Sequence, residues 1–313
     1  RPEYHAAMRD LDLTSLRLFV ADCETRNIAR AAEQHAIVGS AISKRLAALE
    51  HTVGTPLLVR RRRGVEPTPA GETLLEHARA MLAGSDRIER DMAAYAAGVR
   101  GQVHILATAS VLAEALASDV AAFLQEPAHR DIRVGMEERV SPDVVRGIWQ
   151  GVASVGICWD AANLDGLQSL PYRSDHLAIV THPDHPLAAH TQLAFEQALG
   201  CAFVSLPAAS AVQVMLQREA ARMGQTLEHR VVVSNFDAAL RVVRANLAIS
   251  VVPAEVARPF ADLYGLAVMP LTDAWARRRF SICFRDAQSL SPAARLLVDH
   301  LAALGRQEGV DSA

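Results

Sequence analysis

Eight basic residues lie close together near the start of this 313-residue chain, between positions 26 and 65, and only two acidic residues accompany them. This stretch carries a formal charge of +6, whereas the whole chain carries −3, so the remainder sums to −9. Basic side chains at this density can neutralise the phosphates of duplex DNA and release its bound counterions. A solvated arginine-rich loop is the alternative for the densest part. The basic residues are Arg26, Arg30, Lys44, Arg45, Arg60, Arg61, Arg62 and Arg63.

A second group of side chains could offer imidazole and carboxylate ligands to a metal ion. Its members lie within nine positions of one another and are His182, Asp184, His185 and His190. Two of the histidines directly precede proline in a turn-rich stretch. We therefore expect an ordinary loop there and no bound metal.

The cysteines offer little further chemistry. They have no paired short spacing of the kind that builds a zinc site or a disulfide framework, and apolar neighbours favour buried, unreactive thiols over redox sensors. The sequence also contains no glycine-rich nucleotide loop and no serine-hydrolase elbow. We expect no cofactor and no catalytic site. The cysteines are Cys23, Cys158, Cys201 and Cys283.

The composition is that of a globular chain of about two domains, because half of the residues are apolar and 21% are charged. No apolar run approaches the roughly 20 residues that cross a bilayer, and residues 1–10 lack the apolar stretch of a secretory signal. We expect a soluble, cytoplasmic protein with no membrane partner. Residues 1–7 precede the first methionine, Met8, and are set aside as an extension.

Helices are predicted around the basic residues. Apolar spacing indicates a first helix that begins near Thr14 or Ser15, a second over 28–35 and a third over 40–50. The third would bury one stripe, Ile42, Leu46 and Leu49, and expose a small, cationic face, Ser43, Lys44 and Ala47. Two short helices joined by a tight turn, the second with an exposed cationic face, are typical of a helix-turn-helix that enters a major groove.

A basic wing is predicted after the third helix. Residues 57–68 indicate two short strands around an Arg-Gly tip, which would place Arg60 to Arg63 beside the helices. The segments between positions 11 and 75 read, in order, LDLTSLRLFV, ARAAEQHAI, SAISKRLAALEHTVGTPLLVR and GVEPTPAGETLL. Together they resemble the DNA-binding module of the LysR-type bacterial transcriptional regulators, a winged helix-turn-helix. The family usually has a polar Ser-Gln pair after the turn, where this chain has Val38 and Gly39, and Gly39 has no side chain with which to contact a base.

The resemblance implies which side chains contact DNA. Ser43 and Lys44, the only lysine of the chain, would face base edges and phosphates, and Ser40 would lie near the DNA backbone. The wing arginines would follow the phosphates and the minor groove, which adds affinity but little sequence information. The predicted DNA-binding residues are Arg30, Ser40, Ser43, Lys44, Arg60, Arg61, Arg62 and Arg63.

A long helix with a heptad seam is predicted over residues 69–98. Alternating steps of four and three residues favour pairing with a partner helix over a helix that lies on its own domain, and Ser85 is the one polar member. The family resemblance likewise implies dimerisation here, as a homodimer or within a homotetramer. The predicted dimerisation residues are Leu74, Ala78, Met81, Ile88, Met92 and Tyr95.

After Gly101 the pattern changes to strands that alternate with helices, which indicates a parallel-rich α/β fold with helices on both faces. Two such units predict two lobes joined by two crossings. Lobe I would comprise about 102–170 and 266–304, and lobe II about 171–265. The segments DHLAIVTHPDHPLA and RANLAISVVPAEVA make this half similar to the effector-binding domain of the same family, which itself resembles periplasmic binding proteins.

Ligands of open α/β sheets bind at the carboxyl ends of strands, where backbone N–H groups of helix starts can hold an anion. Each serine at such a position could equally be an ordinary helix cap, and Phe236 could be a core residue. Glu138 and Arg139 could help to form the rim. The predicted effector-binding residues are Ser110, Ser205, Ala209, Ser210 and Phe236.

These features predict an α/β protein with three parts: a winged helix-turn-helix over 8–68, a linker helix over 69–98 and an effector-binding domain over 99–313. The predicted function is regulation of transcription at a double-stranded DNA operator, modulated by a small molecule bound between the lobes, and not catalysis. The alternatives are an enzyme or a constitutive architectural protein with a fused helix-turn-helix module.

Overall fold

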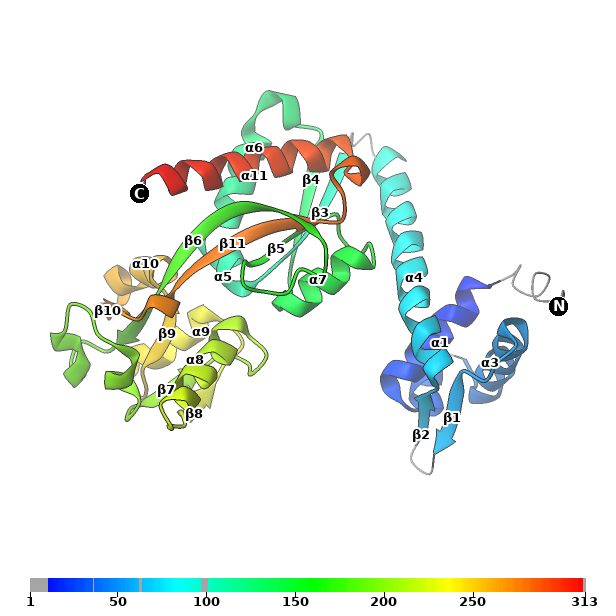
Figure 1. Ribbon diagram of the computed structural model, residues 1–313, viewed down its shortest axis with the longest axis horizontal. Coiled ribbons are helices and arrows are strands. Elements are labelled where there is room, and N and C mark those ends of the chain that lie inside the picture. The colour runs from blue at the N-terminus through cyan, green and yellow to red at the C-terminus, as the bar shows by residue number, and fades with distance from the viewer. Residues whose placement is uncertain (1–10, 36, 62–63, 97–100, 312–313) are drawn as a thin grey trace. The chain divides into compact units, whose positions relative to one another are not determined.

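The structure is a computed structural model that describes residues 11–35, 37–61, 64–96 and 101–311 (Figure 1). The chain divides into two compact units. One is formed by the residues up to Ala93, and the other by most of the residues that follow. Each unit is described by itself below.

The first unit is a winged helix-turn-helix, as the sequence predicts. Its predicted helices and wing strands are all present, and helix α4 follows the wing directly. The elements are α1 Leu13–Thr25, α2 Ile28–Gln34, α3 Gly39–Val53, β1 Leu58–Arg61, β2 Gly64–Pro67 and α4 Pro69–Ala96.

Local contacts position the wing against the helices. The Glu50 carboxylate accepts hydrogen bonds from the backbone N–H groups of Leu57 and Leu58, at 2.7 and 3.2 Å, which ties the end of α3 to the start of β1. Gly64 begins β2 with φ of +134°, and a Cβ there would lie 2.0 Å from the Arg26 carbonyl oxygen. Only glycine fits this close approach, which brings β2 against the end of α1.

The linker helix α4 differs from the prediction in its first half. Ala78 is fully buried in the core of the winged domain, and Leu74 packs against the same core. Ala78 is therefore covered by its own domain and is not exposed to a partner helix, which contradicts that part of the prediction. Leu74 is only partly buried, and its contact with a partner stays a prediction. Farther along α4, an apolar row remains exposed: Met81, Ile88 and Met92. The Tyr95 side chain lies outside the described residues.

The second unit is an α/β domain of two lobes, in line with the predicted fold class. The predicted helix over 110–124 is observed as α5 Ala109–Val111, a π-helical segment Leu112–Leu116 and α6 Ala117–Gln125. The other helices are α7 Ser141–Trp149, α8 Ala211–Arg222, α9 Phe236–Arg244, α10 Ala254–Tyr264 and α11 Pro292–Asp311. The strands are β3 Gly101–Ala107, β4 Ile132–Glu138, β5 Val155–Trp159, β6 Gln168–Thr181, β7 Ala202–Ser205, β8 Glu228–Val232, β9 Ser250–Pro253, β10 Ala267–Pro270 and β11 Arg277–Phe284.

Two long strands connect the lobes. The main sheet has the order β10-β6-β11-β5-β3-β4, and β9 also pairs with β6. Figure 1 shows β6 and β11 side by side, and the two run antiparallel. Among the described residues, parallel strand pairs join β3 with β4 and β5, and β7 with β8. Two isolated parallel bridges also join Leu193 with Leu271 and Phe203 with Ile249. The domain is less parallel than predicted because the chain crosses between the lobes once in each direction.

The two cores show where the crossings lie. In β6, Tyr172 belongs to the core of the first lobe and Leu177 to that of the second. In β11, Phe280 belongs to the first-lobe core, whereas Ala276, just before the strand, belongs to the second. The chain therefore changes lobes between 172 and 177 and again between 276 and 280.

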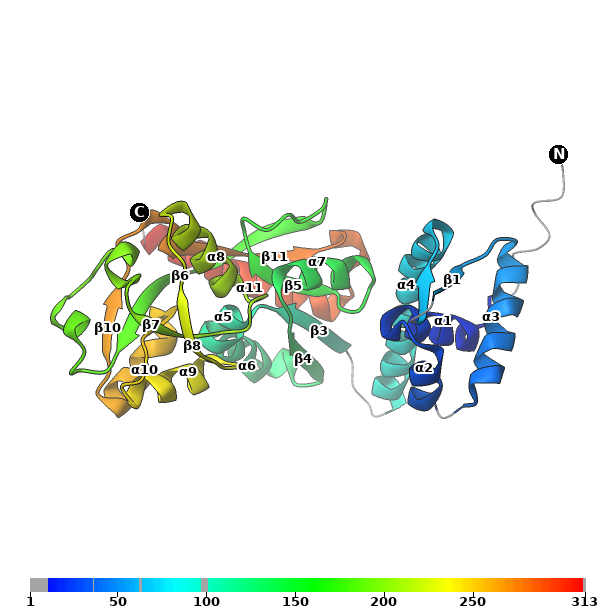
Figure 2. The ribbon, with the colours of Figure 1, turned by 90° about the horizontal axis from the view of Figure 1, so that it is seen from below.

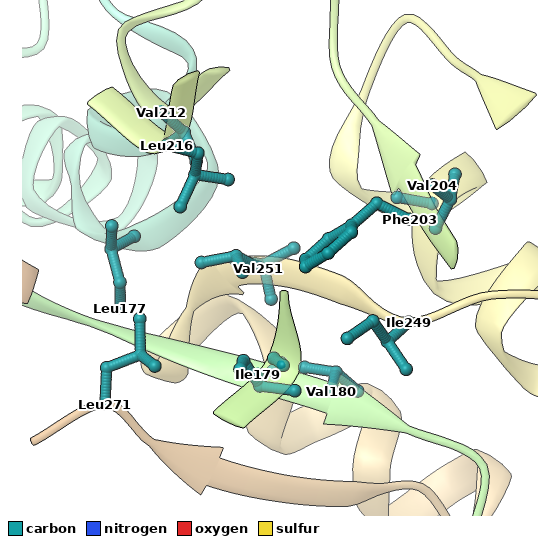
Figure 3. Close-up of a cluster of buried hydrophobic side chains, with 14 of the residues drawn as sticks. Leu177, Ile179, Val180, Phe203, Val204, Val212, Leu216, Ile249, Val251 and Leu271 are labelled. Carbon is teal, nitrogen blue, oxygen red and sulfur yellow. The ribbon is translucent and has the colours of Figure 1, made fainter. Parts of the chain in front are cut away.

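The predicted return to lobe I at position 266 is wrong. Strand β10 pairs with β6 over residues 178–181, in the second lobe. Leu271 donates its backbone N–H to the Leu177 carbonyl at 3.0 Å, and Figure 3 shows both side chains in the second-lobe core. Helix α10 was not predicted either, because its interior residue Pro259 lacks the N–H that a regular helix uses.

Candidate nucleic-acid interface and interlobe site

Helix α3 has one buried and one exposed face, as its sequence predicts. Ile42, Leu46 and Leu49 are buried, whereas Ser40 and Lys44 are exposed and Ser43 is half-buried. Figure 2 shows α3 with α1, α2 and the wing strand β1 of the same unit.

The two neighbouring cations of α3 differ in their contacts. Arg45 forms an ion pair with Asp12, with 3.0 Å between Nη1 and Oδ2, so part of its charge is neutralised. Lys44 has no hydrogen bond or ion pair to any residue that the structure describes. Its ammonium group is therefore available to a phosphate or a base edge.

The structure describes only part of the predicted wing. Arg61 is exposed and forms an ion pair with Glu66 across the hairpin, at 3.1 Å. Arg60 lies in β1, opposite Val65. The Arg60 side chain and the whole of Arg62 and Arg63 lie outside the described residues. Outside the wing, Arg30 on α2 is exposed, as an interfacial residue requires.

Of the predicted effector-binding residues, Ser110 lies at the crossing strands. Its Oγ accepts a hydrogen bond from Arg278 Nη2 at 3.0 Å. Arg278, only 1% exposed, also forms a bidentate ion pair with Asp175, in which Nε and Oδ1 are 2.8 Å apart. Burial raises the pKa of Asp175, and the Arg278 charge lowers it. This ion pair joins β6 to β11 where the chain changes lobes.

Sequence reasoning missed Asp175 and Arg278, although strand periodicity could have found both. Asp175 alternates with the buried Leu177 and Ile179 in β6, and Arg278 alternates with the buried Phe280 in β11. Residues two apart in a strand share a face, so both charged groups belong to the buried face.

The other predicted effector residues lie in the second lobe. Ser210 caps α8, where its Oγ accepts from the Gln213 N–H at 3.3 Å, so the helix-cap alternative is correct for its side chain. Phe236 is a core residue, so the core alternative is correct for its side chain, and an effector contact through its backbone N–H stays a prediction. Ser205 is buried and hydrogen-bonded to His229, with 2.6 Å between Oγ and Nδ1, while Ala209 is exposed.

Three further side chains near the predicted effector residues, Arg139, Thr108 and Arg278, differ in whether their polar atoms have partners. Arg139 forms an ion pair with Glu137 of the same segment. Thr108 Oγ1 and Arg278 Nη1 are buried without a hydrogen-bond partner among the described residues. Thr108 lies two residues before Ser110 in the chain, and Arg278 donates a hydrogen bond to Ser110.

The histidine-rich loop has the structure of a turn. His182 Nδ1 accepts from the Asp184 N–H at 3.2 Å, and His185 Nδ1 accepts from the Leu187 N–H at 3.2 Å. Burial lowers the pKa of His185. The part of the chain that the structure describes contains no group of three or more potential metal ligands.

Comparison with known proteins places both halves in one family. Residues 13–72 match the model for bacterial regulatory helix-turn-helix proteins of the lysR family, and residues 96–306 match the LysR substrate binding domain. The chain belongs to the LysR family. It is a DNA-binding transcriptional regulator with an effector-binding domain, as the motifs predicted.

Similar proteins match this LysR-family chain over most of its length. The probable cat1 operon transcriptional activator of Acinetobacter lwoffii is 27% identical over 261 residues, which cover 81% of this chain and 84% of the relative. The structure of CbnR complexed with its target DNA has a TM-score of 0.65 and 22% identity, with 94% of this chain and all of CbnR covered. The effector-binding domain of QuiR with shikimate has a TM-score of 0.57 and 17% identity, covering 66% of this chain and 98% of QuiR.

Two further findings bear on the sequence predictions, one from the relatives and one from the structure. The relatives are named as regulators of transcription, in line with a role other than catalysis. No helix among the described residues of this LysR-family chain is long and apolar enough to span a membrane.

Proposed function

We propose that this LysR-family regulator binds an operator through α3 and the wing, in the cytoplasm where bacterial DNA lies. The observation that supports this best is Lys44, which is exposed, has no ion-pair partner among the described residues and lies on a helix whose opposite face is buried. The solved complex of CbnR with target DNA shows that a protein of this fold binds DNA. Arg30, Ser40, Ser43 and Arg61 would surround Lys44 at the interface.

The test is the affinity of the full-length protein for duplexes selected from a random library. Lys44→Ala should weaken binding about tenfold and reduce the salt slope of log K by about one. Arg218→Ala is the matched control, because Arg218 is an exposed cation of the effector domain. Equal losses from the two variants, or affinity that does not fall with salt, would contradict the proposed interface.

The exposed apolar row of α4 is the proposed dimer contact. Met81, Ile88 and Met92 are 43%, 63% and 55% exposed, and apolar side chains repeated along one helix are expected to pack against a second helix. Ile88→Glu should convert the dimer into a monomer in light scattering at micromolar concentration. Leu263→Glu, on the exposed surface of α10, should leave the mass unchanged. A wild-type monomer would refute the pairing.

The effector is proposed to bind between the two lobes. Each lobe has its own core, and only β6 and β11 carry the chain between them, so a ligand that contacts both lobes can favour one arrangement over another. The QuiR domain with bound shikimate has the same fold. A thermal-shift screen of small organic acids, beginning with shikimate, should yield a compound that raises Tm and changes DNA affinity. A compound that raises Tm without changing DNA affinity or bending would refute the allosteric part, and turnover of that compound would favour the enzyme alternative.

A further inference from the structure

The start of the recognition helix α3 carries an exposed valine where a polar residue would stabilise the helix. Val38 is the N-cap residue, and its side chain makes no capping hydrogen bond. Polar N-cap residues are preferred because they satisfy the first free N–H groups of a helix. Val38 is nevertheless 68% exposed, so it contributes little to the core of its own domain either. Neither helix stability nor packing accounts for a branched apolar side chain here.

The surroundings of Val38 are those of a DNA contact. The first residues of a recognition helix meet base edges in the major groove, and Lys44 and Ser40 are exposed on the same helix. Gly39 follows Val38 and has no side chain that could separate the valine from a base. The Val38 carbonyl accepts the Ala41 N–H at 2.9 Å, which anchors the residue to the helix end.

We propose that Val38 reads the C5-methyl group of a thymine in the operator. This inference rests on the proposed DNA-binding function. In the major groove the other base-edge groups that distinguish the pairs are hydrogen-bond donors or acceptors, and the thymine methyl is the apolar one. A valine side chain can bury that methyl group but cannot satisfy a donor or an acceptor. Val38 therefore favours thymine over cytosine, which presents an N–H donor in the same region of the groove.

The test replaces single thymines of the selected duplex by deoxyuridine, which lacks only the methyl group. For the wild-type protein, one thymine position in each half of the duplex should lose about fourfold in affinity on this replacement. In Val38→Ser the thymine and deoxyuridine duplexes should bind equally at that position. Val38→Thr keeps one methyl group, adds a capping hydroxyl and should retain part of the preference.

The control is Val214→Ser, an exposed valine of the effector domain that should leave the thymine preference unchanged. Circular dichroism checks that each variant is folded. Two outcomes overturn the inference: deoxyuridine is neutral at every position for the wild type, or the same position keeps its preference in Val38→Ser. Failure to select any duplex would instead refute the DNA-binding function, so the two failures are distinct.

Discussion

The winged domain and the effector domain each bury an aspartate, and the surroundings of the two carboxyl groups are opposite. Asp22 in α1 is fully buried, and neither of its oxygens has a hydrogen-bond partner among the described residues. Asp175 in β6 is also buried, but Arg278 pairs with both of its oxygens. Burial raises the pKa of Asp22 to about 6, and no opposing charge counteracts the shift.

The comparison shows two ways in which a protein accommodates a buried acid. A paired carboxylate keeps its charge but depends on its partner, because removing one charge leaves the other desolvated and uncompensated. An unpaired carboxyl group depends on its proton, because the neutral acid is far less costly to bury than the anion. The first arrangement should be sensitive to mutation of the partner, and the second to pH.

The largest expected effect is on the paired side. Arg278→Leu should destabilise the effector domain by about 3–5 kcal/mol, because it leaves the Asp175 carboxylate buried and unpaired. Urea unfolding followed by tryptophan fluorescence measures this, since Trp149, Trp159 and Trp275 all follow position 101. The double variant with Asp175→Leu should recover most of the loss. If the single variant loses less than about 1 kcal/mol, Asp175 is not held as an anion by Arg278.

The sequence predicted what depends on local periodicity. The buried stripe of α3 and the wing after it follow from spacing within a few residues, and both are present. The packing of Ala78 and Leu74 on their own domain could not be predicted in this way, because both the heptad seam and this packing use the same spacing. Only the tertiary contacts distinguish the two.

The features that were not predicted depend on pairing between residues far apart in the sequence. The return between lobes is set by β10 pairing with β6, about 90 positions apart, and by the Asp175–Arg278 contact across β6 and β11. Neither leaves a local pattern beyond strand alternation. Asp22 shows the same limit in the winged domain: it lies three residues after Phe19 on the buried face of α1, but its charge suggests a solvent-exposed position.

A smaller effect of opposite sign is expected on the unpaired side. Asp22→Leu should stabilise the winged domain by about 1–3 kcal/mol at pH 7.5, because the wild type must either bury an unpaired anion or keep a proton at that pH. Thermal unfolding followed by far-UV circular dichroism measures the change. Glu33→Leu on α2 is the control, since Glu33 is exposed and should show no comparable gain. Destabilisation by Asp22→Leu would mean that the carboxyl group has a favourable partner.

The smallest and most specific effect is the pH dependence of that difference. The Asp22 pKa is about 6 in the folded state and 3.8 for an ordinary, solvated aspartate, so between these pH values the folded state holds a proton that the unfolded state has lost. The contribution of Asp22 protonation to the free energy of unfolding is therefore fully present below pH 3.8 and is lost as pH rises through about 6. Stability of the wild type relative to Asp22→Leu should fall by at most about 1.4 kcal/mol per pH unit over this window and be constant above it. Carboxylates common to both proteins cancel in the difference. A difference that does not change between pH 4 and 7 would show that Asp22 is as readily ionised in the fold as in the unfolded chain, and the contrast with Asp175 would then lie in solvation and not in charge pairing.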